Sequence, residues 1–250
     1  MGALGWSSFA AGAYNRSSGV GSVALGFHNV AWATDSEATG IDGTAIGQVA
    51  LGYGTLASGN AAFTSGQGTE ASGSFSKASG YYTTASDYGS HVIGSWNSSG
   101  SSATSATSFS TSAPAFVIGN GTASNSRSDA FKVMFNGDAT ISNDLTVSGD
   151  VVVSSDARLK ANIVSLGSTL SKLLLIDGKS YTMKKDGKQK IGVLAQEIQE
   201  VFPELVTKDD DEMLAVNYQG LVPVLINALK EQDEKISKLE KLVEKLISEK

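Results

Sequence analysis

Glycine recurs at a fixed interval through the first hundred residues, and this repeat restricts the possible folds more than any other feature. Glycines stand at positions 5, 12, 19, 26, 40, 47, 52, 59, 66, 73, 80 and 94, spaced by seven or fourteen apart from one five-residue step. Ala33 and Asp87 occupy the two vacant positions, and a small residue stands two positions before almost every one. A disordered linker has no physical reason to keep this register over about ninety residues, so the segment is predicted to be ordered.

The seven-residue period predicts a stack of short strands rather than a helix. Glycine and serine are poor helix formers, and the repeat lacks the two apolar positions of a coiled-coil seam. A short strand and a tight turn per repeat fit better, because glycine supplies the positive φ angle that such turns need. Repeats this short must stack to bury a core, and we expect three chains to share an axis of alanine, leucine and isoleucine.

The units "SVALG", "TAIG" and "ASG" carry a family resemblance. Over residues 3–95 they resemble the head of trimeric autotransporter adhesins, which implies a left-handed parallel β-roll assembled from three chains. Aromatic side chains in this segment suit a sugar-stacking surface for a cell-surface or glycan ligand, or else plugs at the ends and insertion points of the roll. They are Trp6, Phe27, Trp32, Tyr53, Tyr81, Tyr82 and Trp96.

Residues 97–154 are expected to form a connector. The stretch 97–113 is polar, and the apolar runs after it are broken at "NG", "NGD" and "SGD". Asn-Gly between alternating apolar residues is a strong turn signal. An intertwined β-prism, as in phage fibre shafts, and a small antiparallel meander both fit this pattern.

The last hundred residues change in composition and in period. Residues 1–150 hold only 4 of the 19 Lys+Arg and 9 of the 25 Asp+Glu. Residues 166–176 could form an amphipathic helix, and from Lys179 we expect two strands around an Asp186–Gly187 turn, then a helix ending before Pro203. The tail has heptads with Leu225, Gln232, Leu239 and Leu246 at one seam position and Leu229, Ile236 and Val243 at the other. The heptads predict a coiled coil of two or three strands, three if the head is trimeric.

Four segments of this region carry a second resemblance: "SDARLKANI" (155–163), "IGVLAQEIQEVFPELV" (191–206), "VNYQGLVPVLINAL" (216–229) and the heptad tail. They resemble the endosialidase-type intramolecular chaperone domain at the ends of phage tail spikes, fibres and some bacterial surface proteins. The resemblance implies a domain that trimerises, assists assembly of the preceding β-rich part, and releases itself by cutting the chain before a serine. That serine works with a lysine five residues on. Many members also have a histidine where this chain reads "GKQKIG".

Carried over by position, the resemblance places the cut between Ser154 and Ser155, with Ser155 and Lys160 as the catalytic pair. A serine hydroxyl becomes a nucleophile once a base takes its proton, and a lysine amine can do so when burial or neighbouring cations favour its neutral form. Assembly of three chains could supply that burial, and N–H groups at a nearby helix start could hold the oxyanion.

A structural role for the same residues is the alternative. Ser155 or Asp156 is a good helix N-cap. Residues five apart on a helix do not share a face, so the catalytic pair requires Ser155 to lie in an extended segment or turn before any helix.

Together these features predict a mainly β N-terminal part and an α+β C-terminal domain. The expected domains are the β-roll head (1–96), the connector with β-prism-like strands (97–154), the chaperone domain (155–222) and a trimeric coiled coil (223–250). The predicted function is a homotrimeric fibre or surface-adhesin segment with a chaperone that cuts itself off, a single-turnover serine endopeptidase. The alternative is a non-cleaving structural trimer with a ligand-binding head.

Composition narrows the other possibilities. The chain has no cysteine and a net charge of −6, so thiolate metal sites are excluded and nothing points to a nucleic-acid partner. No apolar run reaches 18 residues, and we expect no membrane insertion, cofactor or metal. The acidic run 209–212 matches no known metal loop, and the cluster of Asp35, Glu37 and Asp42 is interpreted as an exposed loop. The chain begins inside a repeat without a signal-peptide pattern, so we expect a piece of a longer protein on a virion tail fibre or a bacterial surface.

Overall fold

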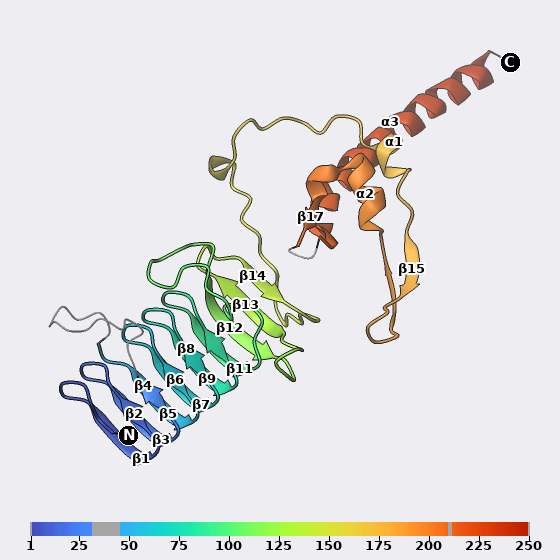
Figure 1. Ribbon diagram of the computed structural model, residues 1–250. Coiled ribbons are helices and arrows are strands. Elements are labelled where there is room, and N and C mark those ends of the chain that lie inside the picture. The colour runs from blue at the N-terminus through green and yellow to red at the C-terminus, as the bar shows by residue number, and fades with distance from the viewer. Residues whose placement is uncertain (1, 32–45, 210–211, 250) are drawn as a thin grey trace. The chain divides into compact units, whose positions relative to one another are not determined.

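The computed structural model describes residues 2–31, 46–209 and 212–249 and divides into two compact units, Met1–Val151 and Val152–Lys250 (Figure 1). The first unit is mainly β and the second combines short strands with helices, as the sequence predicted. Trp32, Ala33 and the cluster of Asp35, Glu37 and Asp42 lie outside the described residues.

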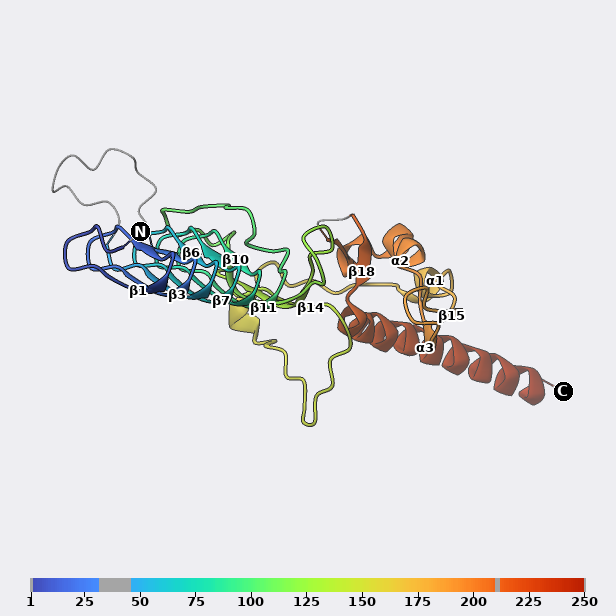
Figure 2. The same cartoon turned by 60° about the horizontal axis from the view of Figure 1, so that its bottom comes forward.

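The first unit is a roll of two parallel sheets whose strands alternate along the chain (Figure 2). The longer strands are β1 (Phe9–Ala13), β3 (Val23–Phe27), β5 (Val49–Tyr53), β7 (Phe63–Gln67), β9 (Lys77–Tyr81) and β11 (His91–Ser95). The shorter ones are β2 (Arg16–Ser17), β4 (Val30–Ala31), β6 (Leu56–Ala57), β8 (Glu70–Ala71) and β10 (Thr84–Ala85). Phe63 pairs with Lys77, and Lys77 with His91, so one coil takes fourteen residues, or two sequence repeats.

Alanine fills the interior of this roll. The small residues two positions before the glycines, or before Ala33 and Asp87, face inward from both sheets; those at 24, 31, 50, 57, 71, 78 and 85 are fully buried. Leu25 and Leu51 point the other way and stay partly exposed. The expectation that alanine would lie on an axis shared by three chains is therefore wrong, because a single chain already encloses it. Side chains this small let the two sheets approach closely.

Close stacking explains the glycines better than turn geometry does. Gly66 has a φ of +114°, and a Cβ there would lie 2.1 Å from the carbonyl oxygen of Gly80 in the next coil. Gly59 does not have positive φ, yet a Cβ there would lie 2.0 Å from the Gly73 oxygen. Both halves of the repeat thus require glycine because backbone meets backbone, whereas positive φ applies to only one half.

Asp87 shows how the repeat ends. Its carboxylate, at a position where the preceding coils have glycine, accepts the backbone N–H groups of Thr104 and Ser105, the latter at 2.7 Å. The connector therefore covers this corner in place of another coil. A side chain is tolerated at Asp87 for that reason.

The connector continues the long sheet as a meander. β12 (Pro114–Asn120) pairs parallel with β11, and β13 (Asp129–Met134) and β14 (Ala139–Ile141) follow antiparallel. Of the two arrangements that the sequence left open, the single chain adopts the antiparallel meander over these strands. Residues 142–156 contain neither helix nor strand.

The second unit has a small apolar core and two hairpins. After η1 (Ala157–Leu159) and α1 (Leu170–Leu173) come β15 (Lys179–Thr182) and β16 (Gln189–Gly192), α2 (Ala195–Val201), η2 (Pro203–Leu205), β17 (Val206–Lys208), β18 (Leu214–Val216), η3 (Tyr218–Gly220) and α3 (Leu221–Ser248). Ile198, Phe202 and Val224 form its buried centre. The predicted strand–turn–strand and the helix before Pro203 are confirmed, whereas the helix expected over 166–176 is confined to α1.

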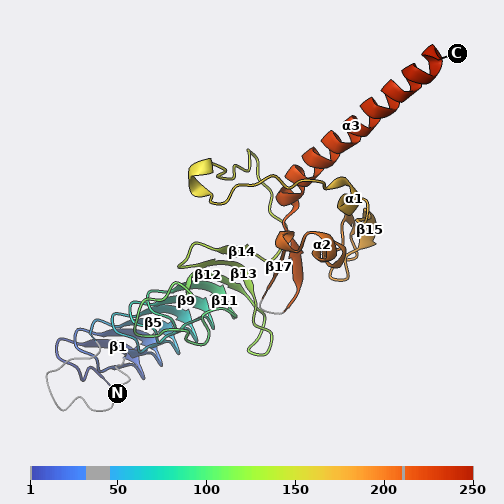
Figure 3. The ribbon, with the colours of Figure 1, turned by 90° about the horizontal axis from the view of Figure 1, so that it is seen from above.

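α3 extends as a straight rod beyond the rest of its unit (Figure 3). Its first turns bury Val224 and Ala228, but the heptad residues after them are largely exposed. Leu239 exposes 61% of its surface and Leu246 64%. A helix with such an apolar stripe needs partner helices, which the single chain does not supply. No helix in the described part of the chain is long and apolar enough to cross a membrane.

Candidate functional site

The segment around the predicted cut is exposed, contains no strand and leads into one short helical turn. Asp156 has extended φ and ψ angles of −62° and 135° and caps η1, accepting the backbone N–H of Arg158 at 2.8 Å. Lys160 closes the turn with angles of −124° and 145°, so the chain leaves it extended. Ser155 precedes the cap and lies outside the helical turn, as a catalytic role requires.

The turn brings Ser155 and Lys160 together. The Nζ of Lys160 donates a hydrogen bond to the Oγ of Ser155 at 2.8 Å. This distance lies in the range of a nucleophile and its base. Ser154, Ser155 and Lys160 are all exposed in the single chain. Asp156, and not Ser155, provides the N-cap that the structural alternative proposed.

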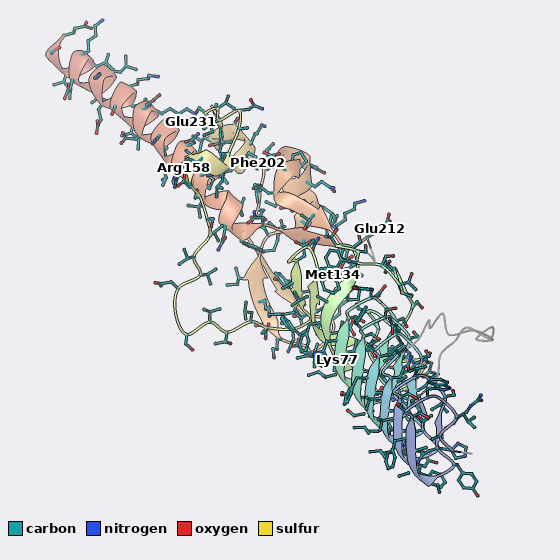
Figure 4. The ribbon with its side chains drawn as sticks, turned by 90° about the vertical axis from the view of Figure 1, so that its left-hand side faces the viewer. Lys77, Met134, Arg158, Phe202, Glu212 and Glu231 are labelled. Carbon is teal, nitrogen blue, oxygen red and sulfur yellow. The ribbon has the colours of Figure 1, made fainter. Side chains whose placement is uncertain are left out.

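Asp156 and Arg158 form the second polar contact of this turn, and Figure 4 labels Arg158 on it. The Nε of Arg158 donates to both carboxylate oxygens at 3.1 Å, and its Nη2 donates to one of them at 2.7 Å. These hydrogen bonds hold the pKa of the Asp156 carboxyl below its ordinary value. An ion pair this exposed contributes little to stability, so its importance lies in the shape of the turn.

Three backbone N–H groups of the turn are engaged within it and do not supply the oxyanion site expected from the sequence. The N–H of Arg158 bonds the Asp156 carboxylate, and those of Leu159 and Lys160 bond the carbonyl oxygens of Asp156 and Ala157. Donors already engaged in this way are not available to a developing negative charge.

Some aromatic side chains of the head pack against one another and are partly covered. Tyr82 stacks on Trp96 with ring centroids 4.3 Å apart, and the guanidinium of Arg127 lies 5.2 Å from the Trp96 ring centroid. A Cβ at Gly68 would lie 2.6 Å from the Tyr82 ring, so that ring is covered on its other side. This stack fits the plugging role. Phe27 and Tyr53 also stack, at 5.4 Å, but they expose 40% and 53% of their surfaces.

Metal ligands were not expected, and the acidic run at 209–212 lies in the β17–β18 connection. Asp210 and Asp211 fall outside the described residues, and Asp209 accepts the backbone N–H of Met213 at 2.8 Å as part of a turn. Among residues 2–31, 46–209 and 212–249, no cluster of three or more His, Asp or Glu side chains could hold a metal ion.

Comparison with known proteins identifies a class for the C-terminal unit. Residues 155–207 match the peptidase S74 family, described as chaperone of endosialidase, and the match begins at Ser155. The resemblance inferred for this region is thereby confirmed.

A particular relative comes from a phage. The long tail fiber protein Gp37 of Escherichia phage AR1 is 36% identical over 84 residues, which is 30% of this chain and 8% of the relative. The match thus covers less than a tenth of that protein's length. The two matches show similarity to a chaperone of endosialidase and, over a small part of its length, to a phage tail fibre protein. The likeness of the first unit to adhesin heads stays a prediction.

Proposed function

We propose that this chain is part of a homotrimeric tail fibre whose C-terminal unit chaperones assembly and then releases itself by cutting between Ser154 and Ser155. The observation that best supports this proposal is the 2.8 Å hydrogen bond between Lys160 Nζ and Ser155 Oγ. Ser155 is also the residue at which the match to the chaperone family begins. A short polar turn with only a structural function has no need to bring a hydroxyl and an amine together in this way.

The proposed chemistry uses these two side chains and one water molecule. Neutral Lys160 takes the hydroxyl proton of Ser155, and Oγ attacks the carbonyl carbon of Ser154. The peptide C–N bond breaks as Lys160 gives this proton to the Ser155 nitrogen. The product is an ester between the Ser154 carbonyl carbon and the Ser155 Oγ. Water then hydrolyses the ester, giving a carboxylate at Ser154 and a free amine and hydroxyl at Ser155.

Assembly is proposed to activate the site. Water surrounds both side chains in the single chain, and a lysine amine acts as a base only when neutral. The site is flanked in the sequence by apolar residues that the chain leaves uncovered, such as Val152 at 86% and Val164 at 83% exposure. Neighbouring chains that bury these residues would also exclude water from Lys160 and favour its neutral form. Cutting would then follow correct assembly.

The head is proposed to bind a glycan. Phe27 and Tyr53 present neighbouring exposed rings, and an apolar ring face suits the flat side of a sugar.

Intact mass spectrometry of freshly expressed protein tests the cleavage. The parent should give two fragments that meet between Ser154 and Ser155, whereas Ser155→Ala and Lys160→Ala should stay full length. Ser154→Ala is the matched control, because it removes the neighbouring hydroxyl and leaves the pair intact, so it should still be cut. Full-length parent protein under conditions where the trimer forms would contradict the proposal and favour a non-cleaving structural trimer.

A further inference from the structure

The carboxylate of Asp156 organises the turn between the proposed nucleophile and base. It accepts four hydrogen bonds: one from the backbone N–H of Arg158 at 2.8 Å and three from the guanidinium of the same residue at 2.7 to 3.1 Å. A single side chain therefore ties the start of η1 to its middle, both through the backbone and through a paired charge.

The turn is what makes the catalytic contact possible. In an extended chain the Cα atoms of residues 155 and 160 would lie about 17 Å apart, which a lysine side chain does not span. η1 shortens this path, and its end is fixed because the N–H of Lys160 bonds the carbonyl oxygen of Ala157 at 3.1 Å. The position of Nζ beside Ser155 Oγ therefore depends on the turn being closed.

The pairing with Arg158 also removes a competitor. A free carboxylate next to Ser155 would attract the Lys160 ammonium and compete with the serine hydroxyl, because opposite charges attract. With both carboxylate oxygens held by Arg158, the Lys160 side chain bonds the neutral Ser155 hydroxyl instead.

We infer that Asp156 is a positioning residue of the self-cleavage, closing the 157–159 turn and engaging Arg158 so that Lys160 lies on Ser155. This inference rests on the proposed self-cleavage. Asp156 itself touches neither the scissile bond nor the proton that moves. Its removal should therefore lower the cutting rate across the whole pH range.

The test measures the rate of fragment formation by intact mass during refolding of the full chain, over a range of pH. Asp156→Ala should slow cutting by about tenfold to a hundredfold, the usual effect of a misplaced catalytic group. Asp156→Asn keeps an acceptor for the Arg158 N–H and should recover part of that loss. Asp150→Ala, which removes an exposed carboxylate on the other side of the cut, should behave like the parent.

The outcomes separate this inference from the proposal beneath it. If the parent cuts, Ser155→Ala does not, and both Asp156 variants cut at the parent rate, positioning by Asp156 is wrong and self-cleavage stands. A loss confined to one end of the pH range would also overturn positioning, since Asp156 would then act only through the charge of Lys160. Absence of fragments from the parent would reject both. A circular dichroism spectrum of Asp156→Ala that matches the parent shows that slower cutting is not a loss of fold.

Discussion

The carboxylate of Glu231 on α3 accepts the backbone N–H of Leu170 at 3.1 Å and thereby caps α1. The same side chain accepts the hydroxyl of Ser168 at 2.6 Å and the N–H of Thr169. The hydroxyl of Thr169 in turn bonds the carbonyl oxygen of Val224 at 2.9 Å. Figure 4 labels Glu231 on the long helix. These contacts fix the chain that follows the proposed cut to the long helix, which explains why α1 begins only after Thr169.

Glu231→Ala should loosen this attachment, and the effect should depend on pH. The hydroxyl of Ser168, followed by the N–H of Thr169, lowers the pKa of the Glu231 carboxyl. A carboxyl with a lowered folded-state pKa stabilises the fold above the ordinary glutamate value of about 4.3 and loses that contribution as the pH falls through the lowered value. The urea midpoint, followed by circular dichroism, should therefore drop in Glu231→Ala at neutral pH and approach that of the parent in acid. Glu234→Ala, one turn further on, should leave it unchanged at both.

Gly66→Ala should destabilise the roll more than Gly54→Ala. Both glycines have positive φ, +114° and +62°, but a Cβ at Gly54 meets nothing within 4 Å. Gly54→Ala should therefore cost only the conformational penalty of roughly 1 kcal/mol. Gly66→Ala should cost a further 1–3 kcal/mol or so, because the backbone of the next coil must move. Tryptophan fluorescence during unfolding reports on the first unit alone, since all three tryptophans lie there. Equal losses would show that φ, and not stacking, requires glycine.

Asn29→Ala should be far more costly than Thr69→Ala. The buried Asn29 amide donates to the carbonyl oxygens of Leu25 and Gly52 at 2.6 Å each, and its oxygen accepts the N–H of Thr55 at 3.0 Å. Alanine would leave these groups unpaired inside the roll, at a cost of at least about 2 kcal/mol. The Thr69 hydroxyl is buried without a partner in the described chain, so its removal should be nearly neutral. Fluorescence-monitored unfolding would compare the two.

The sequence predicted stacked strands because the glycine period is regular, but it did not reveal that two repeats make one coil. Gly66 and Gly59 occupy the same position of the seven-residue repeat in the sequence. In the structure they belong to different halves of a coil, and only Gly66 has a positive φ angle. The helix over 166–176 was predicted too long, and the strands β17 and β18 were missed, for a similar reason. Capping by Glu231 comes from 61 residues further along the chain, and three-residue strands give too short a pattern to detect.

The proposed catalytic pair could be suggested only through resemblance. From the spacing alone, Ser155 and Lys160 could lie on one helix and point apart. They meet because Asp156, the residue after Ser155, is the last residue of the extended segment and the N-cap of η1. The polar Asp156–Arg158 pairing is local enough to be anticipated from "SDAR". Its relation to Lys160 depends on how the turn closes in three dimensions.

Leu239→Gln should separate the chains, whereas Lys241→Gln should not. Glutamine is about as good a helix former as leucine or lysine, so neither change should unfold α3 itself. Leu239 is 61% exposed in the single chain, and its loss would be harmless unless partner helices cover it. In a coiled coil each chain would lose roughly 1.5–3 kcal/mol of apolar burial, enough to shift a trimer toward monomers in sedimentation equilibrium. The cutting rate measured on the same samples would show whether self-cleavage depends on assembly. Cutting that slows as the trimer dissociates supports activation by neighbouring chains, and cutting at the parent rate in monomers would contradict it.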